Sequence, residues 1–149
     1  MKILFDTSSL INLWQAGASF LKKLGASTTV EVAEELQYAI GIYESRQLLE
    51  GIEVLQSRKA KPEQRGLSGT DASLLRTAKE SESFLASDDK KLLGTARSSR
   101  CSCGNTPQLI ESLSQKISKA EAIEILEKLK FTYPRKKILE STLQRVRKW

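Results

Sequence analysis

Four acidic residues in this chain each lie where a short apolar, strand-like segment gives way to the expected start of a helix. They are Asp6 after MKILF, Glu35 in TTVEVAEEL, Asp71 in LSGTDASLL and Asp89 in SFLASDDKKL. If their carboxylates converge, they form a site for a hard divalent cation, because Mg²⁺ and Mn²⁺ prefer oxygen ligands and need no histidine. Two carboxylates about 4 Å apart repel by about 4 kcal/mol at an effective dielectric near 20, so a converged site requires a cation or a proton. Its chemistry would be metal-assisted hydrolysis of a phosphodiester.

Each acid also has a structural explanation when it is taken alone. Asp6 and Ser8 can cap the helix that follows them, and Ser68 with Asp71 forms a capping-box pattern. Asp88 and Asp89 favour a helix N-terminus through the helix dipole, and Glu35 fits an exposed helical position. The conjunction favours a site, because the strand-to-helix turns of an open parallel sheet share its carboxyl edge, where ligands bind at the point at which strand order reverses.

The elements that must position these acids follow from the alternation of short apolar segments with helical spacing. This alternation predicts an α/β fold, a three-layer α/β/α sandwich with a central parallel sheet. The expected strands are Ile3–Phe5, Ser27–Val30, Ile52–Leu55, Ser83–Ala86 and Cys101–Cys103. Helical spacing recurs over 30–40 and 74–78, and Ser57–Gly69, with its Lys, Pro and Gly residues, is the best loop.

The C-terminal part of the chain is predicted to be helical. A short helix follows Pro107, a capping box from Ser118 to Glu121 opens a helix to Leu129, and a final basic helix follows Pro134. Residues 1–149 are therefore expected to form a single domain, with 107–149 a helical, basic C-terminal extension of it.

Composition excludes several mechanisms. The chain has no histidine, which excludes Ser-His-Asp hydrolysis and histidine-dependent ribonuclease chemistry. Cys101 and Cys103 cannot complete a four-ligand zinc site within one chain, and we expect them to be reduced, on one face of a short strand. No apolar segment is long enough to span a bilayer or resembles a signal peptide, so a cytoplasmic protein without membrane association is expected.

The net charge of +6 is unevenly distributed. Residues 1–96 contain 12 Lys/Arg and 13 Asp/Glu, whereas residues 97–149 contain 12 and 5. The basic C-terminal part could form a phosphate-attracting rim around an acidic centre, or it could be an ordinary solvated helix surface.

The ordered set of segments ILFDTSSLI, TTVEVAEEL, LSGTDASLL and LASDDKKL resembles the PIN-domain family of ribonucleases, including its prokaryotic VapC-like branch, over about residues 1–130. This resemblance implies a PIN-like fold with strand order 3-2-1-4-5. It also implies that Asp6, Glu35, Asp71 and Asp89 are catalytic ligands of Mg²⁺ or Mn²⁺, supported by Ser8 and Ser87. The family pattern favours Asp89 over its neighbour Asp88, which stays a candidate metal ligand, and favours Glu35 over Glu34 and Glu31.

The resemblance implies a Mg²⁺- or Mn²⁺-dependent endoribonuclease, a hydrolase that binds RNA and that could be the toxin of a toxin–antitoxin pair, with a small antitoxin protein and a homodimer as expected partners. Candidate substrate-binding residues, as contacts to backbone phosphates, are Lys90, Lys91 and Arg97, with Lys59, Lys61, Arg65 and Arg100 as further candidates.

Two alternatives stay open. One is a catalytically inactive PIN-like module that binds RNA or protein, in which the basic C-terminal helix and Trp14 or Trp149 would carry the function. The other is a DNA nuclease of the flap-endonuclease kind, which is disfavoured because the chain lacks room for the helical arch of those enzymes. Ile11, Leu13 and Trp14 could serve a dimer contact, although core packing is the commoner use of such residues.

Overall fold

The computed structural model, which describes residues 1–17, 20–56 and 66–149, is built on one five-stranded parallel sheet of order β3-β2-β1-β4-β5. This confirms the predicted α/β class and strand order. The strands are β1 (Lys2–Phe5), β2 (Gly25–Thr29), β3 (Glu53–Leu55), β4 (Phe84–Ala86) and β5 (Cys103–Gly104).

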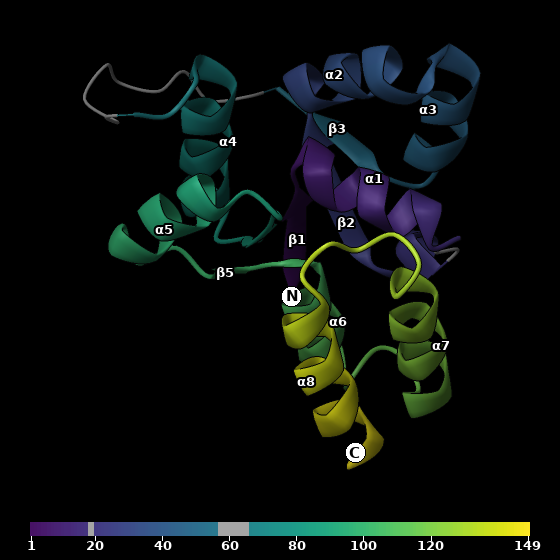
Figure 1. The fold of residues 1–149 in the computed structure, drawn as a ribbon. Coiled ribbons are helices and arrows are strands. Elements are labelled where there is room, and N and C mark those ends of the chain that lie inside the picture. Colours follow the sequence, from purple (N-terminus) through teal and green to yellow (C-terminus); the bar gives the residue numbers. More distant parts are fainter. Residues whose placement is uncertain (18–19, 57–65) are drawn as a thin grey trace.

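Helices cover both faces of the sheet. Figure 1 shows α4 and α5 on one side of the strands and α1 on the other, with α2 and α3 above α1 and the C-terminal helices α6 to α8 below it. The helices are α1 (Thr7–Gln15), α2 (Val30–Ile40), α3 (Ile42–Leu49), α4 (Gly69–Glu80), α5 (Lys90–Ser98), α6 (Thr106–Ser112), α7 (Lys119–Leu129) and α8 (Lys136–Arg147), with a 3₁₀ turn η1 (Phe20–Lys23) before β2. None of the helices in the described ranges is both long and apolar enough to cross a membrane.

The centre of the sheet explains why these segments form strands. Ile3, Leu4 and Phe5 of β1 are completely buried, as expected for a parallel strand covered on both faces. Strand β1 pairs with β2 on one side and with β4 on the other, so the order of connections reverses between β1 and β4. The fold therefore places the carboxyl ends of β1 and β4 side by side at the switch point of the sheet.

All five strands differ from their predicted ranges, three of them by one residue and β2 and β5 by two residues at their start. Strand β2 begins at Gly25 rather than Ser27, and its polar residues hide the apolar pattern: the Ser27 hydroxyl donates to the Ile3 carbonyl at 3.1 Å and the Thr28 hydroxyl to the Phe5 carbonyl at 2.8 Å. Strand β5 starts at Cys103, so Cys101 lies before it rather than within it. Both cysteines are free thiols. Burial raises the pKa of each thiol, which lowers the fraction of reactive thiolate.

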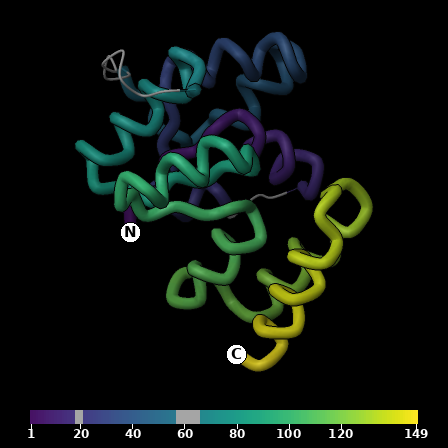
Figure 2. The backbone as a smooth tube through the Cα atoms, turned by 60° about the vertical axis from the view of Figure 1, so that its left-hand side comes forward, coloured from purple at the N-terminus to yellow at the C-terminus, as the bar shows by residue number. Residues whose placement is uncertain are grey.

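The helical C-terminal part packs against the rest of the molecule. The predicted capping box at the start of α7 is confirmed, since Ser118 and Glu121 exchange both hydrogen bonds. A second capping box, between Asn105 and Gln108, opens α6. Apolar residues of α6, α7 and α8 join the same buried cluster as the strands, including Leu109, Leu126, Leu129, Leu139 and Leu143. Figure 2 shows the loop between α7 and α8 returning toward the N-terminal half of the chain.

Helix α3 is a separate element that no sequence pattern predicted. It begins after Gly41, whose positive φ of 90° permits the sharp break from α2. Of the predicted loop Ser57–Gly69, residues 57–65 lie outside the described residues, and Ser68 caps α4.

Gly104 at the end of β5 provides a test of the packing beside the switch point. A Cβ atom there would lie 2.9 Å from the Phe84 ring and 3.0 Å from the Gln108 side chain. We expect Gly104→Ala to lower the free energy of unfolding by about 1–3 kcal/mol, as other overpacking substitutions do. Gly94→Ala on α5 is the matched control: nothing lies within 4 Å of its Cβ position, and removing a helical glycine stabilises by up to about 1 kcal/mol. Urea denaturation of both variants measures this, and equal stabilities for the two would contradict the packing.

Candidate functional site

Asp6 is the first residue after β1 and is buried, with 6% of its surface exposed. Its Oδ1 accepts a hydrogen bond from the Thr7 N–H at 2.7 Å, which makes it the N-cap of α1. Its Oδ2 accepts from the Ser87 hydroxyl at 2.7 Å and from the Ser8 hydroxyl at 3.1 Å. The carboxylate is therefore fixed by groups from α1 and from the turn after β4.

The two serine hydroxyls are oriented by the backbone of that turn. The Asp88 N–H donates to Ser8 Oγ at 3.0 Å, and the Asp89 N–H donates to Ser87 Oγ at 3.1 Å. Each serine oxygen accepts a hydrogen bond from one of these amides. The single proton of each hydroxyl is then donated to Asp6 Oδ2. Ser8 and Ser87, both predicted as supporting residues, therefore contact the first acid directly.

The other three predicted acids come from different helices of the same sheet edge. Asp71 lies in the first turn of α4 and is half-buried. Asp89 is exposed and caps α5, with Oδ1 accepting from the Lys91 and Leu92 amides at 2.8 and 3.1 Å. Glu35 is exposed on α2, and its Oε2 accepts from the Thr7 hydroxyl at 2.5 Å. We call Asp6, Glu35, Asp71 and Asp89 the acid site.

The charges of the acid site act on one another. Burial is the main cause that raises the pKa of Asp6 to about 6, and the charge of Asp71 adds to it. Burial also raises the pKa of Asp71, followed by the charges of Asp89 and Glu35. The three hydrogen bonds to Asp6 act in the opposite direction but do not offset its desolvation. Asp71 thus lies within electrostatic range of each of the other three acids.

Asp88 is turned toward a different set of partners. Its Oδ1 accepts from the Tyr133 hydroxyl at 2.7 Å and the Thr106 N–H at 2.9 Å, and its Oδ2 accepts from the Asn12 amide at 2.7 Å and the Thr106 hydroxyl. The Arg135 guanidinium donates to the Asp88 backbone carbonyl. Four donors occupy the four good acceptor positions of this carboxylate, whereas Asp89 Oδ2 has no hydrogen bond among the described residues.

Glu31 and Glu34 lie on the same helix as Glu35. Glu34 is exposed, and Glu31 is half-buried in the first turn of α2, four residues before Glu35 and so on the same face.

The donor chemistry of the acid site fits a hard divalent cation, although the acids are not gathered into a finished cage. Across residues 1–17, 20–56 and 66–149, no group of three or more His, Cys, Asp or Glu side chains is arranged to hold a metal ion. Within the same ranges, no Lys or Arg forms an ion pair with any of the four acids. Burial and mutual repulsion raise the pKa of Asp6 and Asp71, so these oxygens lack a compensating positive charge among the described residues. Mg²⁺ or Mn²⁺, which prefer oxygen ligands, would supply that charge.

The predicted phosphate-binding cations divide into two groups. Lys90, Lys91 and Arg97 are exposed on α5, and the charge of Lys91 lowers the pKa of Asp71, so Lys91 lies beside the acid site. Arg97 donates to Gln108 at 3.4 Å, and Arg100 is exposed beyond the end of α5. The predicted Lys59, Lys61 and Arg65 lie outside the described residues.

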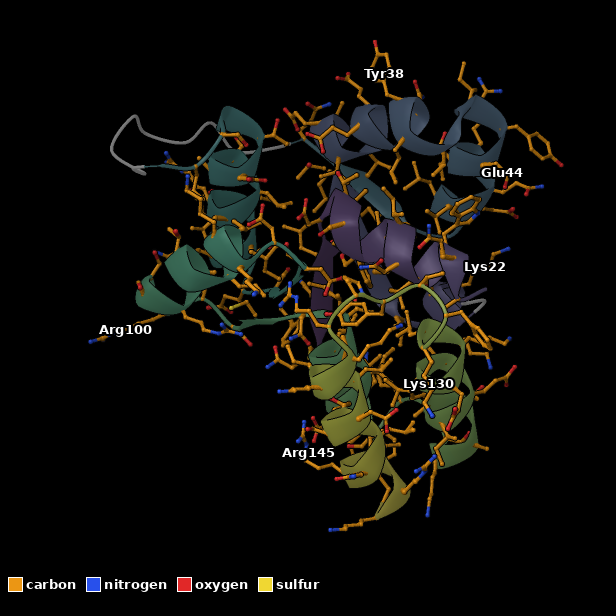
Figure 3. The ribbon with its side chains drawn as sticks, in the orientation of Figure 1. Lys22, Tyr38, Glu44, Arg100, Lys130 and Arg145 are labelled. Carbon is orange, nitrogen blue, oxygen red and sulfur yellow. The ribbon has the colours of Figure 1, made fainter. Side chains whose placement is uncertain are left out.

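Part of the basic C-terminal surface is paired with acids. Arg145 forms two hydrogen bonds with Glu111, Arg147 pairs with Glu127, and Lys130 pairs with Glu127 and Glu140. Figure 3 shows Arg145 and Lys130 on the two helices below the sheet, α8 and the end of α7. These contacts reduce the charge that this surface can offer to a phosphate backbone.

The remaining candidates are apolar. Leu13 is completely buried, so the core explanation is confirmed for it. Ile11 is partly buried and packs against the same core. Trp14 is half-buried beside a cavity of about 190 Å³ at the C-terminal end of α1, and Trp149 is 38% exposed.

Several residues around the acid site were missed by the sequence analysis. They are Thr7, Asn12, Thr106, Tyr133 and Arg135. Only Thr7 carried a local signal, because it adjoins Asp6. The others reach Asp88 from 18 to 76 positions away, which no local pattern reveals.

No protein-family model matches this sequence, and a search of curated proteins found no match. Among solved structures, the fold is similar to that of PAE2754 from Pyrobaculum aerophilum, with a TM-score of 0.60 and 18% sequence identity. The similarity covers 77% of this chain and 98% of that protein. At this identity the likeness shows the fold alone.

Proposed function

We propose that this chain is a metal-dependent endoribonuclease of the PIN-domain kind, which hydrolyses RNA phosphodiester bonds with Mg²⁺ or Mn²⁺ held by Asp6, Glu35, Asp71 and Asp89. The observation that carries the proposal is the position of Asp6. It is buried at the switch point of a parallel sheet, bonded to Ser8 and Ser87, and coupled to a second acid of the same edge. Helix capping does not explain Ser87, which caps none of the described helices and is completely buried.

The residues of the acid site have separate tasks in this proposal. Asp6 keeps one lone pair of Oδ1 for a metal, because the two serines and the Thr7 N–H occupy its other positions. Asp71 and the unbonded Oδ2 of Asp89 supply further oxygens. Glu35 is held through its other oxygen by Thr7, which leaves Oε1 to bind metal or to accept a proton from the attacking water. The bound metal supplies an activated water and charge stabilisation at the leaving oxygen.

RNA would approach the acid site from the side of α5. Lys91 lies nearest to Asp71 and can contact a backbone phosphate beside the scissile bond, with Lys90 and Arg97 farther along the same helix. We expect Lys91→Gln to weaken RNA binding uniformly across sequences and to reduce the salt dependence of binding by about one phosphate contact. Binding titrations at several salt concentrations measure this. An unchanged salt slope would exclude Lys91 as a phosphate contact.

Cleavage assays with purified protein test the proposed function directly. Structured RNA and flap DNA are incubated side by side with Mg²⁺, with Mn²⁺ or with a chelator. We expect cleavage of RNA that requires the metal, and intact flap DNA. Preferred cleavage of the flap would support the DNA-nuclease alternative, and no cleavage of either substrate would contradict the proposal.

A binding module without catalysis is the second candidate. It is favoured by the absence of a finished metal-binding group within residues 1–17, 20–56 and 66–149. Calorimetric titration with Mn²⁺ separates the two candidates, because a module that uses only its basic surface has no need of the ion. Lack of Mn²⁺ binding near millimolar concentrations, together with RNA or protein binding, would favour the module.

The proposed partners other than RNA follow from the same family resemblance. If the chain is a toxin, a small antitoxin would insert into the acid site, and the active form would be a homodimer. Sedimentation of the purified protein measures the second point, with a dimer expected at micromolar concentration.

A further inference from the structure

The turn that carries Asp89 is fastened to the C-terminal part of the chain through its middle residue. Asp88 lies between Ser87 and Asp89, which face the acid site, and its own side chain leaves the turn toward Asn12 of α1, Thr106 of α6 and Tyr133. Figures 1 and 2 agree in placing the loop between α7 and α8 near α1. Residues from three distant segments therefore meet at one carboxylate next to the acid site.

Two of the contacts come from the loop before α8. Tyr133 is completely buried, and its hydroxyl donates to Asp88 Oδ1 at 2.7 Å. Arg135 donates to the backbone carbonyl of the same residue. Tyr133 and Arg135, two positions apart in the loop, thus hold the side chain and the backbone carbonyl of Asp88.

Hydrogen bonds of this turn connect Asp88 to the acid site. The Asp88 N–H donates to Ser8 Oγ, and the Ser8 hydroxyl donates to Asp6 Oδ2. The next amide, that of Asp89, donates to Ser87 Oγ, and the Ser87 hydroxyl donates to the same Asp6 oxygen. A displacement of the turn would move both serine protons away from Asp6 and would rotate Asp89 out of place.

We propose that Asp88 is a positioning residue rather than a metal ligand, and that Tyr133 and Arg135 hold it so that the turn 87–89 presents Ser87 and Asp89 to the acid site. The expected effect on metal binding and catalysis rests on the proposed metal-dependent function, whereas the hydrogen bonds that hold the turn do not. The C-terminal segment then contributes to catalysis without touching metal or RNA.

The structure offers closely matched variants. Tyr133→Phe removes one hydroxyl and keeps the buried ring, and Arg135→Gln removes the donor to the Asp88 carbonyl. Arg145→Gln is the control, because Arg145 lies on α8, which follows that loop, and pairs with Glu111, away from the turn. It should lower stability without altering the turn.

Hydrogen exchange of the metal-free protein tests the geometry. We expect the amides of Asp88 and Asp89 to exchange about 10-fold faster in Tyr133→Phe and Arg135→Gln than in the wild type, and at the wild-type rate in Arg145→Gln. Equal exchange in all four proteins would overturn the inference, whether or not the protein is a nuclease.

Calorimetry with Mn²⁺ and steady-state cleavage test the consequence. The two turn variants should bind Mn²⁺ about 10-fold more weakly, the lower end of the loss seen when groups that orient metal ligands are removed. Their kcat should fall while KM for RNA stays unchanged, because no RNA contact is altered.

The outcomes separate the two proposals. Faster exchange with unchanged Mn²⁺ affinity and unchanged kcat would show that the turn does not matter to the site and would overturn the positioning role. Asp88→Asn distinguishes the ligand alternative: if Asp88 binds metal, this variant should lose Mn²⁺ affinity as fully as Asp71→Asn while Tyr133→Phe keeps it, which would also overturn the inference. A wild type that binds no Mn²⁺ would refute the proposed function, and the exchange result would still decide whether Tyr133 and Arg135 hold the turn.

Discussion

Replacing Asp6 with asparagine is expected to slow RNA cleavage by at least about 100-fold and, at neutral pH, to make the metal-free protein more stable. Asparagine can still accept the Thr7 N–H through its oxygen, so α1 keeps its cap, while its NH₂ group can donate to the oxygens of Ser8 and Ser87. The variant lacks the negative charge that holds the cation. Loss of the several kcal/mol that a bound metal supplies to the transition state lowers kcat by about 100-fold to 1,000-fold.

The gain in stability has a separate physical cause. The pKa of Asp6 rises from 3.8 to about 6 on folding, so ionising this residue in the folded protein opposes folding by about 3 kcal/mol at neutral pH. Asparagine carries no such penalty. Cleavage assays and urea denaturation at pH 7 without metal measure both effects.

Glu44→Gln on α3 provides the control for loss of one negative charge. Figure 3 shows Glu44 at the outer end of the helical layer, pointing away from the strands. This variant should cleave RNA at the wild-type rate and unfold at nearly the wild-type urea concentration. An Asp6→Asn protein that cleaves RNA at the wild-type rate would exclude Asp6 as a metal ligand.

The pH dependence of stability should carry the signature of Asp6. Because its folded pKa lies above its unfolded pKa, protonated Asp6 contributes stability that is fully present below pH 3.8 and is lost as the pH rises through about 6. An acidic residue whose pKa falls on folding shows the opposite pH dependence, contributing stability that is lost as the pH falls. The wild type should therefore lose about 2.4 kcal/mol relative to Asp6→Asn between pH 4 and pH 7.

Comparing the two proteins isolates this group, since all other titrations are common to both. At pH 7, Mn²⁺ should stabilise the wild type by about 2.7 kcal/mol at a concentration 100 times its dissociation constant, and should not stabilise Asp6→Asn. Urea denaturation at each pH measures the difference. If the difference in unfolding free energy between the two proteins does not change with pH, the pKa of Asp6 is not raised by burial and this part of the account is wrong.

The alternation of apolar segments with helical spacing was sufficient for the α/β class and the parallel sheet, whereas the strand order followed from the family resemblance. Asp6 directly follows the buried strand β1 and Asp89 lies three residues after β4, and the carboxyl ends of these neighbouring parallel strands share one edge of the sheet. Strand β2 was placed less accurately because Ser27 and Thr28 satisfy their hydroxyls on the carbonyls of β1, so a buried strand carries polar letters.

Asp88 shows what the sequence could not supply. Adjacent aspartates look alike in a motif, and only the partners of each distinguish them. Those partners, Asn12, Thr106 and Tyr133, are 76, 18 and 45 positions away. The difference between a carboxylate with every acceptor position filled and one with an oxygen left over is a property of the tertiary structure.

The charge of the C-terminal part illustrates a second limit. The sequence shows the excess of Lys and Arg after residue 96, but it does not show which of these cations pair with acidic side chains. Arg145 and Arg147 lie opposite Glu111 and Glu127 from neighbouring helices, so these cations first serve to join α8 to α6 and α7. Exposed pairs of this kind contribute little to stability, at most about 1 kcal/mol each.

A crystal structure of the protein grown with Mn²⁺ tests the central claim most directly, because the anomalous signal of manganese locates the ion independently of the protein atoms. Our account predicts an ion bonded to Asp6 Oδ1 and to an oxygen of Asp71, at about 2.0–2.3 Å, with Asp88 still hydrogen-bonded to Tyr133. Manganese absent from this edge of the sheet, with Asp6 and Asp71 too far apart to share an ion, would contradict it.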